Sequence, residues 1–156
     1  MPKLNKIVAF LDEFLGTDDV DDSSWNVLQF EGKSIVKRAA FAVDAGIDAF
    51  KMSADVKADI LIVHHGHFWD FRNPSITGWA KERIKILFEN DISIYVSHNP
   101  LDRHKEVGHN AQILKLLGAR ITDEFFSLSR EKHRLDGRVP ECVSVEKKLW
   151  KSSTGS

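Results

Sequence analysis

The sequence predicts an α/β fold, with a parallel or mixed sheet and helices on both faces. Short apolar runs at 59–63 and 92–96 have the length and composition of strands that are covered on both faces. Each run is followed by a segment in which apolar residues recur at helical spacing, at 78–90 and at 110–117. Strands that alternate with helices in this way pair in parallel through right-handed crossovers.

The N-terminal part of the chain adds one helix and one further strand–helix pair. Apolar residues recur at helical spacing from Leu4 to Leu15, and Gly16 is expected to end that helix. The stretch 39–43 predicts a buried strand, and the stretch 46–57 predicts the helix that follows it.

Two segments carry more specific expectations about burial. In the helix at 78–90, four apolar side chains have the spacing of a core-facing stripe: Trp79, Ile84, Leu87 and Phe88. Between the first helix and the first strand, four aspartates lie within residues 18–22. This cluster lacks the glycine and the distal glutamate of a calcium-binding loop, so we expect a solvated turn.

Composition narrows the range of partners. The chain has 156 residues and a net charge of −1 at pH 7, which gives no electrostatic attraction to nucleic acid or to anionic membranes. No apolar run approaches the roughly 18 residues that span a bilayer, so we expect no membrane partner. Cys142 is the single cysteine, which excludes an internal disulfide and favours a cytoplasmic location.

The chain is expected to divide into two regions. Residues 1–126 contain all the predicted strands and helices apart from one weak strand signal at 143–145. Beyond them, residues 127–138 are rich in charge and residues 151–156 are polar. We therefore expect an α/β metal-binding half-domain at 1–126 and an atypical, poorly ordered tail at 127–156.

The residues with the clearest chemical meaning follow two neighbouring strands. His64 and His65 come directly after the run 59–63, and Asp102 follows the next run along the chain. Ligands of open α/β sheets bind beyond the carboxyl ends of the strands. Gly66 allows the chain to turn there, so both imidazoles can face one cavity. A single histidine at a strand end is most often structural, but a pair with a nearby aspartate favours a metal site.

Imidazole and carboxylate ligands suit first-row divalent metals, and a carboxylate can bridge two ions. We therefore expect His64, His65 and Asp102 to bind divalent metal, with up to two ions in a complete site. The ligand types fit zinc, iron, manganese, cobalt and nickel, and do not choose among them.

Other polar residues near these strands are weaker candidates for a role in catalysis. His67 and His98 are expected to support the ligands or line the pocket. Glu106 could act as a general base, although a solvated position is expected for it. His104 and His109 lie in a polar loop that enters a helix, where we expect exposure, with a substrate contact open for either.

Several stretches of the sequence resemble the NGG-interacting-factor-three-like (Nif-three-like) family, whose bacterial members are called GTP cyclohydrolase type-two homologues. Residues 25–32, Trp-Asn-Val-Leu-Gln-Phe-Glu-Gly, are similar to the family segment that reads asparagine, glycine, leucine, glutamine and then a glycine. The remaining similar stretches are 64–69, 87–92, 100–102 and 108–111. The resemblance thus covers most of residues 1–126.

The resemblance implies a two-lobed fold, of which this chain carries the first half, and a dinuclear metal centre in a ring-shaped hexamer. The paired histidines and the bridging aspartate of the family motif fall on His64, His65 and Asp102. Where a reaction is assigned in the family, it is hydrolytic opening of the guanine ring of GTP, which implies a nucleotide substrate. Other members are linked to transcription partners or to nucleic acid.

The sequence departs from the family pattern after Asp102. Family members continue into a second half that adds a histidine and a glutamate to the metals, and no His-x-x-x-Glu spacing follows Asp102 here. We therefore expect a truncated or frame-shifted product, whose hydrolase activity is lost or depends on ligands from a partner chain. Two alternatives stay open: a non-catalytic module that binds protein or nucleic acid, and an inactive truncated remnant.

Overall fold

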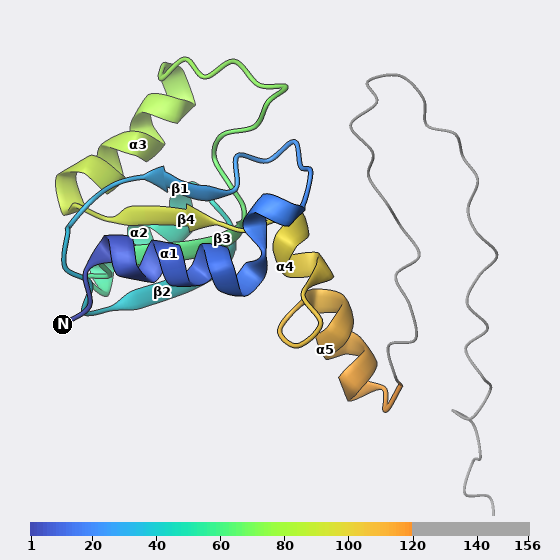
Figure 1. Ribbon diagram of the computed structural model, residues 1–156. Helices are drawn as coiled ribbons and strands as arrows, with labels where there is room; N and C mark the ends of the chain where they lie inside the picture. Colours follow the sequence, from blue (N-terminus) through green and yellow to red (C-terminus); the bar gives the residue numbers. More distant parts are fainter. Residues whose placement is uncertain (120–156) are drawn as a thin grey trace, which may run out of the picture. The chain divides into compact units, whose positions relative to one another are not determined.

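In the computed structural model the described residues are 1–119, so the tail expected at 127–156 lies outside them. Four strands form one mixed sheet in the order β1-β4-β3-β2 (Figure 1). Their bounds are Val27–Phe30 for β1, Ala39–Asp44 for β2, Ile60–His65 for β3 and Ser93–Val96 for β4. Strands β2, β3 and β4 run parallel, and β1 pairs antiparallel with β4.

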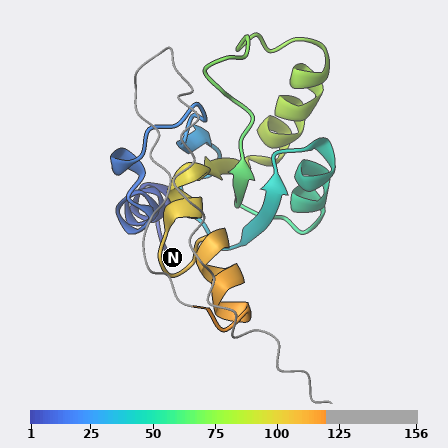
Figure 2. The same ribbon diagram turned by 90° about the vertical axis from the view of Figure 1, so that its right-hand side faces the viewer.

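Helices cover both faces of this sheet. The helices are α1 (Leu4–Leu15), α2 (Ile47–Asp55), α3 (Gly78–Asn90), α4 (Asn99–Arg103) and α5 (His109–Leu116), with a 3-10 turn at Thr17–Asp19. Helix α1 lies on one side of the sheet, and α2 and α3 lie on the other (Figure 2). The predicted α/β class, with helices on both faces of a mixed sheet, is confirmed. Among residues 1–119, no helix has the length and hydropathy needed to cross a membrane.

Each face of the sheet buries its own apolar cluster. The cluster under α1 contains Leu4, Leu15, Val36, Ile60 and Tyr95. The cluster under α2 and α3 contains Ala45, Phe50, Leu61, Val63, Leu87, Ile92, Ile94 and Val96. Strand β3 contributes to both clusters because successive side chains of a strand point to opposite faces. The central strands β3 and β4 are therefore the most firmly held part of the sheet, and the candidate ligands follow them.

Two of the four apolar side chains of α3 that were predicted to face the core do so. Leu87 is fully buried and Ile84 packs against the core, as predicted. Trp79 and Phe88 are 58% and 75% exposed, so the prediction is wrong for both. Ala80 takes the buried position in the first turn of the helix instead, which leaves the Trp79 indole facing the loop that precedes the helix.

The stretch 39–43 is a strand, but the prediction that it is buried is wrong. Strand β2 pairs only with β3 among the described residues, so it forms an edge of the sheet. Ala40 and Ala42 face the core beneath α2 and α3. Phe41 and Val43 point to the opposite face and are exposed, Phe41 by 75%.

Candidate metal centre

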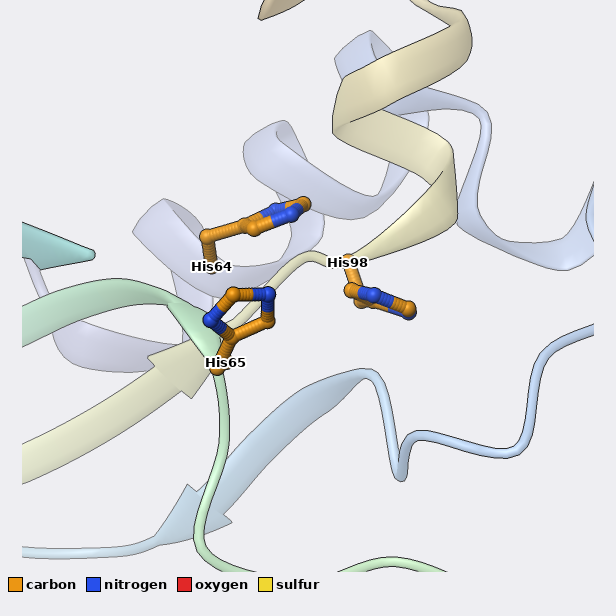
Figure 3. A group of neighbouring side chains, drawn as sticks. All are labelled: His64, His65 and His98. Carbon is orange, nitrogen blue, oxygen red and sulfur yellow. The ribbon is translucent and has the colours of Figure 1, made fainter. Parts of the chain in front are cut away.

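Five candidate ligands gather at the carboxyl ends of the two central strands. His64 and His65 are the last two residues of β3. His98 lies just beyond β4, Asp102 lies in the short helix α4, and His109 is the first residue of α5. Figure 3 shows His64 and His65 at the end of β3, with His98 on the segment that enters α4. Ligands of parallel sheets are expected at these carboxyl ends of the strands.

His64 lies at the centre of this cluster. It is 8% exposed, and its ring centroid lies 4.5 Å from that of His65, 4.8 Å from that of His98 and 4.6 Å from that of His109. Two sets of potential ligand atoms each fall within 4.8 Å: His64, His65 and His98 in one, and His64, Asp102 and His109 in the other. The geometry therefore offers two adjacent three-ligand groups that share His64.

The predicted trio of His64, His65 and Asp102 is divided between these two groups. Asp102 lies beside His64, with its Oδ2 3.6 Å from His64 Nε2, and its Oδ1 is 2.7 Å from His109 Nδ1. His65 belongs to the other group. The structure thus brings the predicted residues into one cluster and adds His98 and His109, which the sequence had placed in supporting or exposed positions.

Four imidazoles of the cluster are held through Nδ1, and for His64, His65 and His98 the acceptor lies outside the two ligand groups. The acceptors are the Ser97 carbonyl for His64 at 3.1 Å, an Asp44 carboxylate oxygen for His65 at 2.7 Å and the Asp22 carboxylate for His98 at 3.0 Å. Because each partner can only accept, Nδ1 carries a proton, and Nε2 is the atom left to bind a metal ion. Such outer hydrogen bonds fix the tautomer and orientation that metal-binding histidines need.

Asp22 is the residue for which the solvated-turn prediction fails. Its side chain is 2% exposed, and it accepts hydrogen bonds from the backbone N–H groups of Ser24 and Asn99 as well as from His98. Burial raises the pKa of the Asp22 carboxyl, but these hydrogen bonds, with one from the Asn26 side chain, outweigh it and hold the pKa below its ordinary value. Asp22 is therefore an ionised carboxylate that ties the N-terminal loop to His98.

The surroundings of His64 lower the pKa of its imidazole. Burial is the main cause that lowers the pKa of the His64 imidazole, and the nearby His65 and His109 lower it further. The Ser97 carbonyl and Asp102 act in the opposite direction without reversing the shift. A neutral imidazole is the form that binds a metal ion.

The turn after β3 is held by Gln29 of β1. The Gln29 Oε1 accepts hydrogen bonds from the backbone of His67 and Phe68, and its Nε2 donates to the carbonyls of Trp25 and Phe68. A Cβ atom on Gly66 would lie 2.5 Å from Gln29 Nε2. Gly66 is thus required for close approach to Gln29, as well as for the turn that the sequence suggested.

The other candidates lie near the cluster but outside both ligand groups. Glu106 is exposed, in the solvated position expected for it. His104 binds the Phe14 carbonyl through Nε2 and accepts backbone hydrogen bonds through Nδ1, so its role is structural. His67 is buried and faces Phe68 and Trp79. Burial lowers its pKa, and the charges of Arg83 and Arg72 lower it further.

The donor set fits divalent metal. Imidazoles whose Nδ1 atoms are hydrogen-bonded, together with one carboxylate, are ligands of the kind that first-row ions prefer. Because His64 offers one lone pair, at Nε2, it can serve only one of the two groups at a time. The number and identity of ions stay predictions.

The chain matches a known protein family along most of its length. The family model described as Duf34/NIF3 (NGG1p interacting factor 3) matches residues 2–150, which extends past the stretch that carries recognisable motifs. A GTP cyclohydrolase 1 type 2 homolog from Archaeoglobus fulgidus is 42% identical over 142 residues, which cover 91% of this chain and 58% of the relative. The chain spans about half the length of the curated relatives it matches.

Solved structures also match this chain in fold and in sequence. A protein described as ybgI, of unknown function, superposes with a TM-score of 0.77 at 37% identity, over 80% of this chain and 51% of its own. The protein TTHA1606 from Thermus thermophilus gives a TM-score of 0.72 at 42% identity, over 75% of this chain and 48% of its own. By the family match, the sequence identities and the fold, the chain belongs to the Duf34/NIF3 family.

Proposed function

We propose that this chain binds divalent metal at the His64 cluster and supplies one half of a metal-dependent hydrolase site. The observation that carries the proposal is the arrangement of His64, His65 and His98. Their Nδ1 atoms are all engaged by acceptors, which leaves the Nε2 atoms to bind an ion, and one potential ligand atom from each of the three lies within 4.8 Å of the others. A purely structural role would not require three histidines side by side at the ends of two strands.

In this proposal five side chains are potential metal ligands, in two groups. His64 would bind an ion through Nε2 in one of the two groups, either with His65 and His98 or with Asp102 and His109, because that atom offers a single lone pair. Asp102 would help to hold the metal, since its two oxygens face His64 and His109. A divalent ion bound there would supply a Lewis acid that lowers the pKa of water and orients it.

The proposed substrate and assembly rest on the family resemblance. The curated relatives carry the name GTP cyclohydrolase 1 type 2 homolog, and we extend this to a nucleotide substrate for the present chain. We also propose a homo-oligomer, a hexamer by family resemblance, in which further ligands can come from another chain. The single cysteine keeps the cytoplasm as the proposed location.

Elemental analysis of the protein purified without added metal or chelator tests the metal site. We expect bound divalent metal in the unaltered chain and a steep loss in Asp102→Ala and in His64→Ala. Asp48→Ala is the matched control, because Asp48 is an exposed aspartate in the first turn of α2. Retained stoichiometry in Asp102→Ala and His64→Ala would remove the proposal.

Hydrolysis is tested separately on the metal-loaded protein. Incubation with GTP should give ring-opened product, resolved by chromatography, and the Asp102→Ala variant should give none. Metal binding without turnover would leave a metal-binding module and exclude the hydrolase part of the proposal.

A second candidate function is a module that binds another protein without metal. The observation that favours it is the open edge of β2, where Phe41 and Val43 are exposed. A strand edge with exposed apolar side chains is a template for pairing with another chain. Partner binding that survives removal of metal by a chelator would favour this module over the hydrolase.

A further inference from the structure

A pocket of about 380 Å³ lies beside the metal centre, within the range of roughly 300–1,000 Å³ typical of small-molecule sites. It is formed by the loop between β3 and α3, the start of α3 and the segment before β1. Its aromatic walls are Trp25, Phe68, Trp69 and Trp79. Trp69 is shared with the metal centre, since its ring centroid lies 5.1 Å from that of His98 and 6.4 Å from that of His65.

The polar groups of the pocket indicate the charge of its ligand. Arg72 lines the pocket, and no acidic side chain does so among the described residues. His67 also lines it, is 7% exposed and has a buried Nδ1 without a hydrogen-bond partner in the described part of the chain. With Arg72 as its charged group, the pocket suits a ligand that carries negative charge.

The aromatic walls are held in place before any ligand binds. The Arg83 guanidinium lies 4.7 Å from the ring centroid of Trp79, and Arg83 is itself hydrogen-bonded to the Ala45 carbonyl. The Trp69 indole donates to the Gly66 carbonyl at 2.9 Å, and the Trp25 indole donates to Asp70 at 2.6 Å. Fixed aromatic faces favour stacking because little side-chain entropy is lost on binding.

We propose that this pocket binds a flat aromatic ring that carries an anionic group, with the ring against Trp79 and Trp69 and the anion at Arg72. The proposal names the substrate class of the metal centre, and to that extent it rests on the proposed function. A nucleoside phosphate and an aromatic carboxylate share this chemistry, so the experiment separates them.

Isothermal titration calorimetry of the full chain, after removal of metal by a chelator, measures the binding. The probes are guanosine 5′-monophosphate and pterin-6-carboxylate, with guanosine as the ring without the anion and ribose 5-phosphate as the anion without the ring. We expect at least one of the two complete probes to bind, and both partial probes to bind at least about tenfold more weakly. The complete probe that binds identifies the source of the anion.

Two substitutions assign the binding to the pocket. Trp79→Leu and Arg72→Gln should each weaken the bound probe by about tenfold, because stacking and the charged hydrogen bond are removed one at a time. Phe88→Leu and Lys81→Gln are matched controls, since both residues are exposed on α3 and do not line the pocket. They should leave the affinity unchanged.

The pocket and the metal centre can fail independently. Absence of binding by both complete probes, or equal affinity in Trp79→Leu and Arg72→Gln, would overturn the pocket proposal even if the protein binds metal. Binding that depends on Trp79 and Arg72 in the metal-free chain would support the pocket even if no metal is found in the purified protein.

Discussion

Val27, at the start of β1, has an unfavourable backbone conformation for its side chain. Its φ is 86°, in the region that favours glycine, and a β-branched side chain is particularly disfavoured there. The side chain still packs against the cluster beneath α1, so strain and burial oppose each other at this position. A comparison of two small replacements can separate the two effects.

We predict that Val27→Gly is more stable than Val27→Ala by about 1 kcal/mol, because both lose the packing of valine but only glycine relieves the strain. At an ordinary strand position the order is reversed, with glycine less stable by about 0.5–1 kcal/mol. Urea unfolding of both variants measures the difference. A less stable Val27→Gly would mean that the backbone at residue 27 is not in the left-handed region in solution.

The sequence identified the centre of the candidate site but not its surroundings. His64, His65 and Asp102 could be predicted because they follow consecutive parallel strands, whose ends meet at one edge. Asp22 and Asp44 were missed as partners of His98 and His65, because each contact joins residues 21 to 76 positions apart. Only the folded sheet brings such pairs together.

At the scale of elements, Gln29 of β1 holds the turn that directly follows His64 and His65. The amide of Gln29 is fixed by four hydrogen bonds to that turn and to Trp25. It therefore cannot swing aside like an ordinary surface glutamine when a Cβ is added at Gly66. The cost of Gly66→Ala should depend on which side chain stands at 29.

We predict that Gly66→Ala destabilises the chain by about 1–3 kcal/mol, because the new methyl group overlaps the fixed amide. In a Gln29→Ala background the same substitution should cost clearly less, since the obstacle is gone. A double-mutant cycle on the free energy of unfolding measures this coupling. Strictly additive effects would show that Gly66 is needed for the turn alone.

Asp59 connects the segment before β2 to the start of β3. Its carboxylate accepts hydrogen bonds from the backbone N–H groups of Lys37 and Arg38, and Lys33 lies 3.4 Å away. Burial raises the pKa of the Asp59 carboxyl, but these hydrogen bonds and the Lys33 charge outweigh it and hold the pKa below its ordinary value. The charged form therefore stabilises the folded state.

The pH dependence of stability should report this carboxylate. A pKa that is lower in the folded state means that the stabilisation is fully present above the unfolded pKa of about 4, and is lost as pH falls through the folded value. We predict that Asp59→Asn reduces stability at pH 7 and flattens the decline between about pH 5 and pH 2. Denaturant unfolding at several pH values tests this, with the exposed Asp55→Asn as a control that keeps the original slope.

Helices with a clear periodic pattern were predicted well. Strand β1 and the exposure of β2 depend on which strands lie beside them, and these were not predicted. The bounds of α3 agree with the prediction, and α1 ends at Gly16, whose φ of 62° is the left-handed cap expected of glycine. Strand β1 was missed because it has four half-buried residues and an irregular register with β4, which leaves no alternation to detect. The exposure of β2 was also missed, because an apolar run does not reveal whether a second strand lies beside it.

At the scale of the whole molecule, the described residues form a sheet with an open edge at β2. Phe41 on that edge and Phe88 on α3 are both 75% exposed, but only Phe41 stands beside unpaired backbone groups. Natural proteins protect such edges with charged side chains, above all lysine. We therefore expect that the β2 edge can pair with a second copy of the chain.

We predict that Phe41→Lys lowers concentration-dependent association of the chain more than Phe88→Lys does. The two substitutions add the same charge and remove the same apolar group at equal exposure, so the difference between them measures the contribution of the open strand edge. Sedimentation velocity over a range of protein concentrations gives the comparison, with thermal unfolding to verify that both variants fold. If the two variants associate equally, apolar exposure alone drives association and the β2 edge has no special part in it. If Phe41→Lys alone becomes monomeric while its metal content is unchanged, association through β2 and the metal centre at the ends of β3 and β4 are independent properties of the fold.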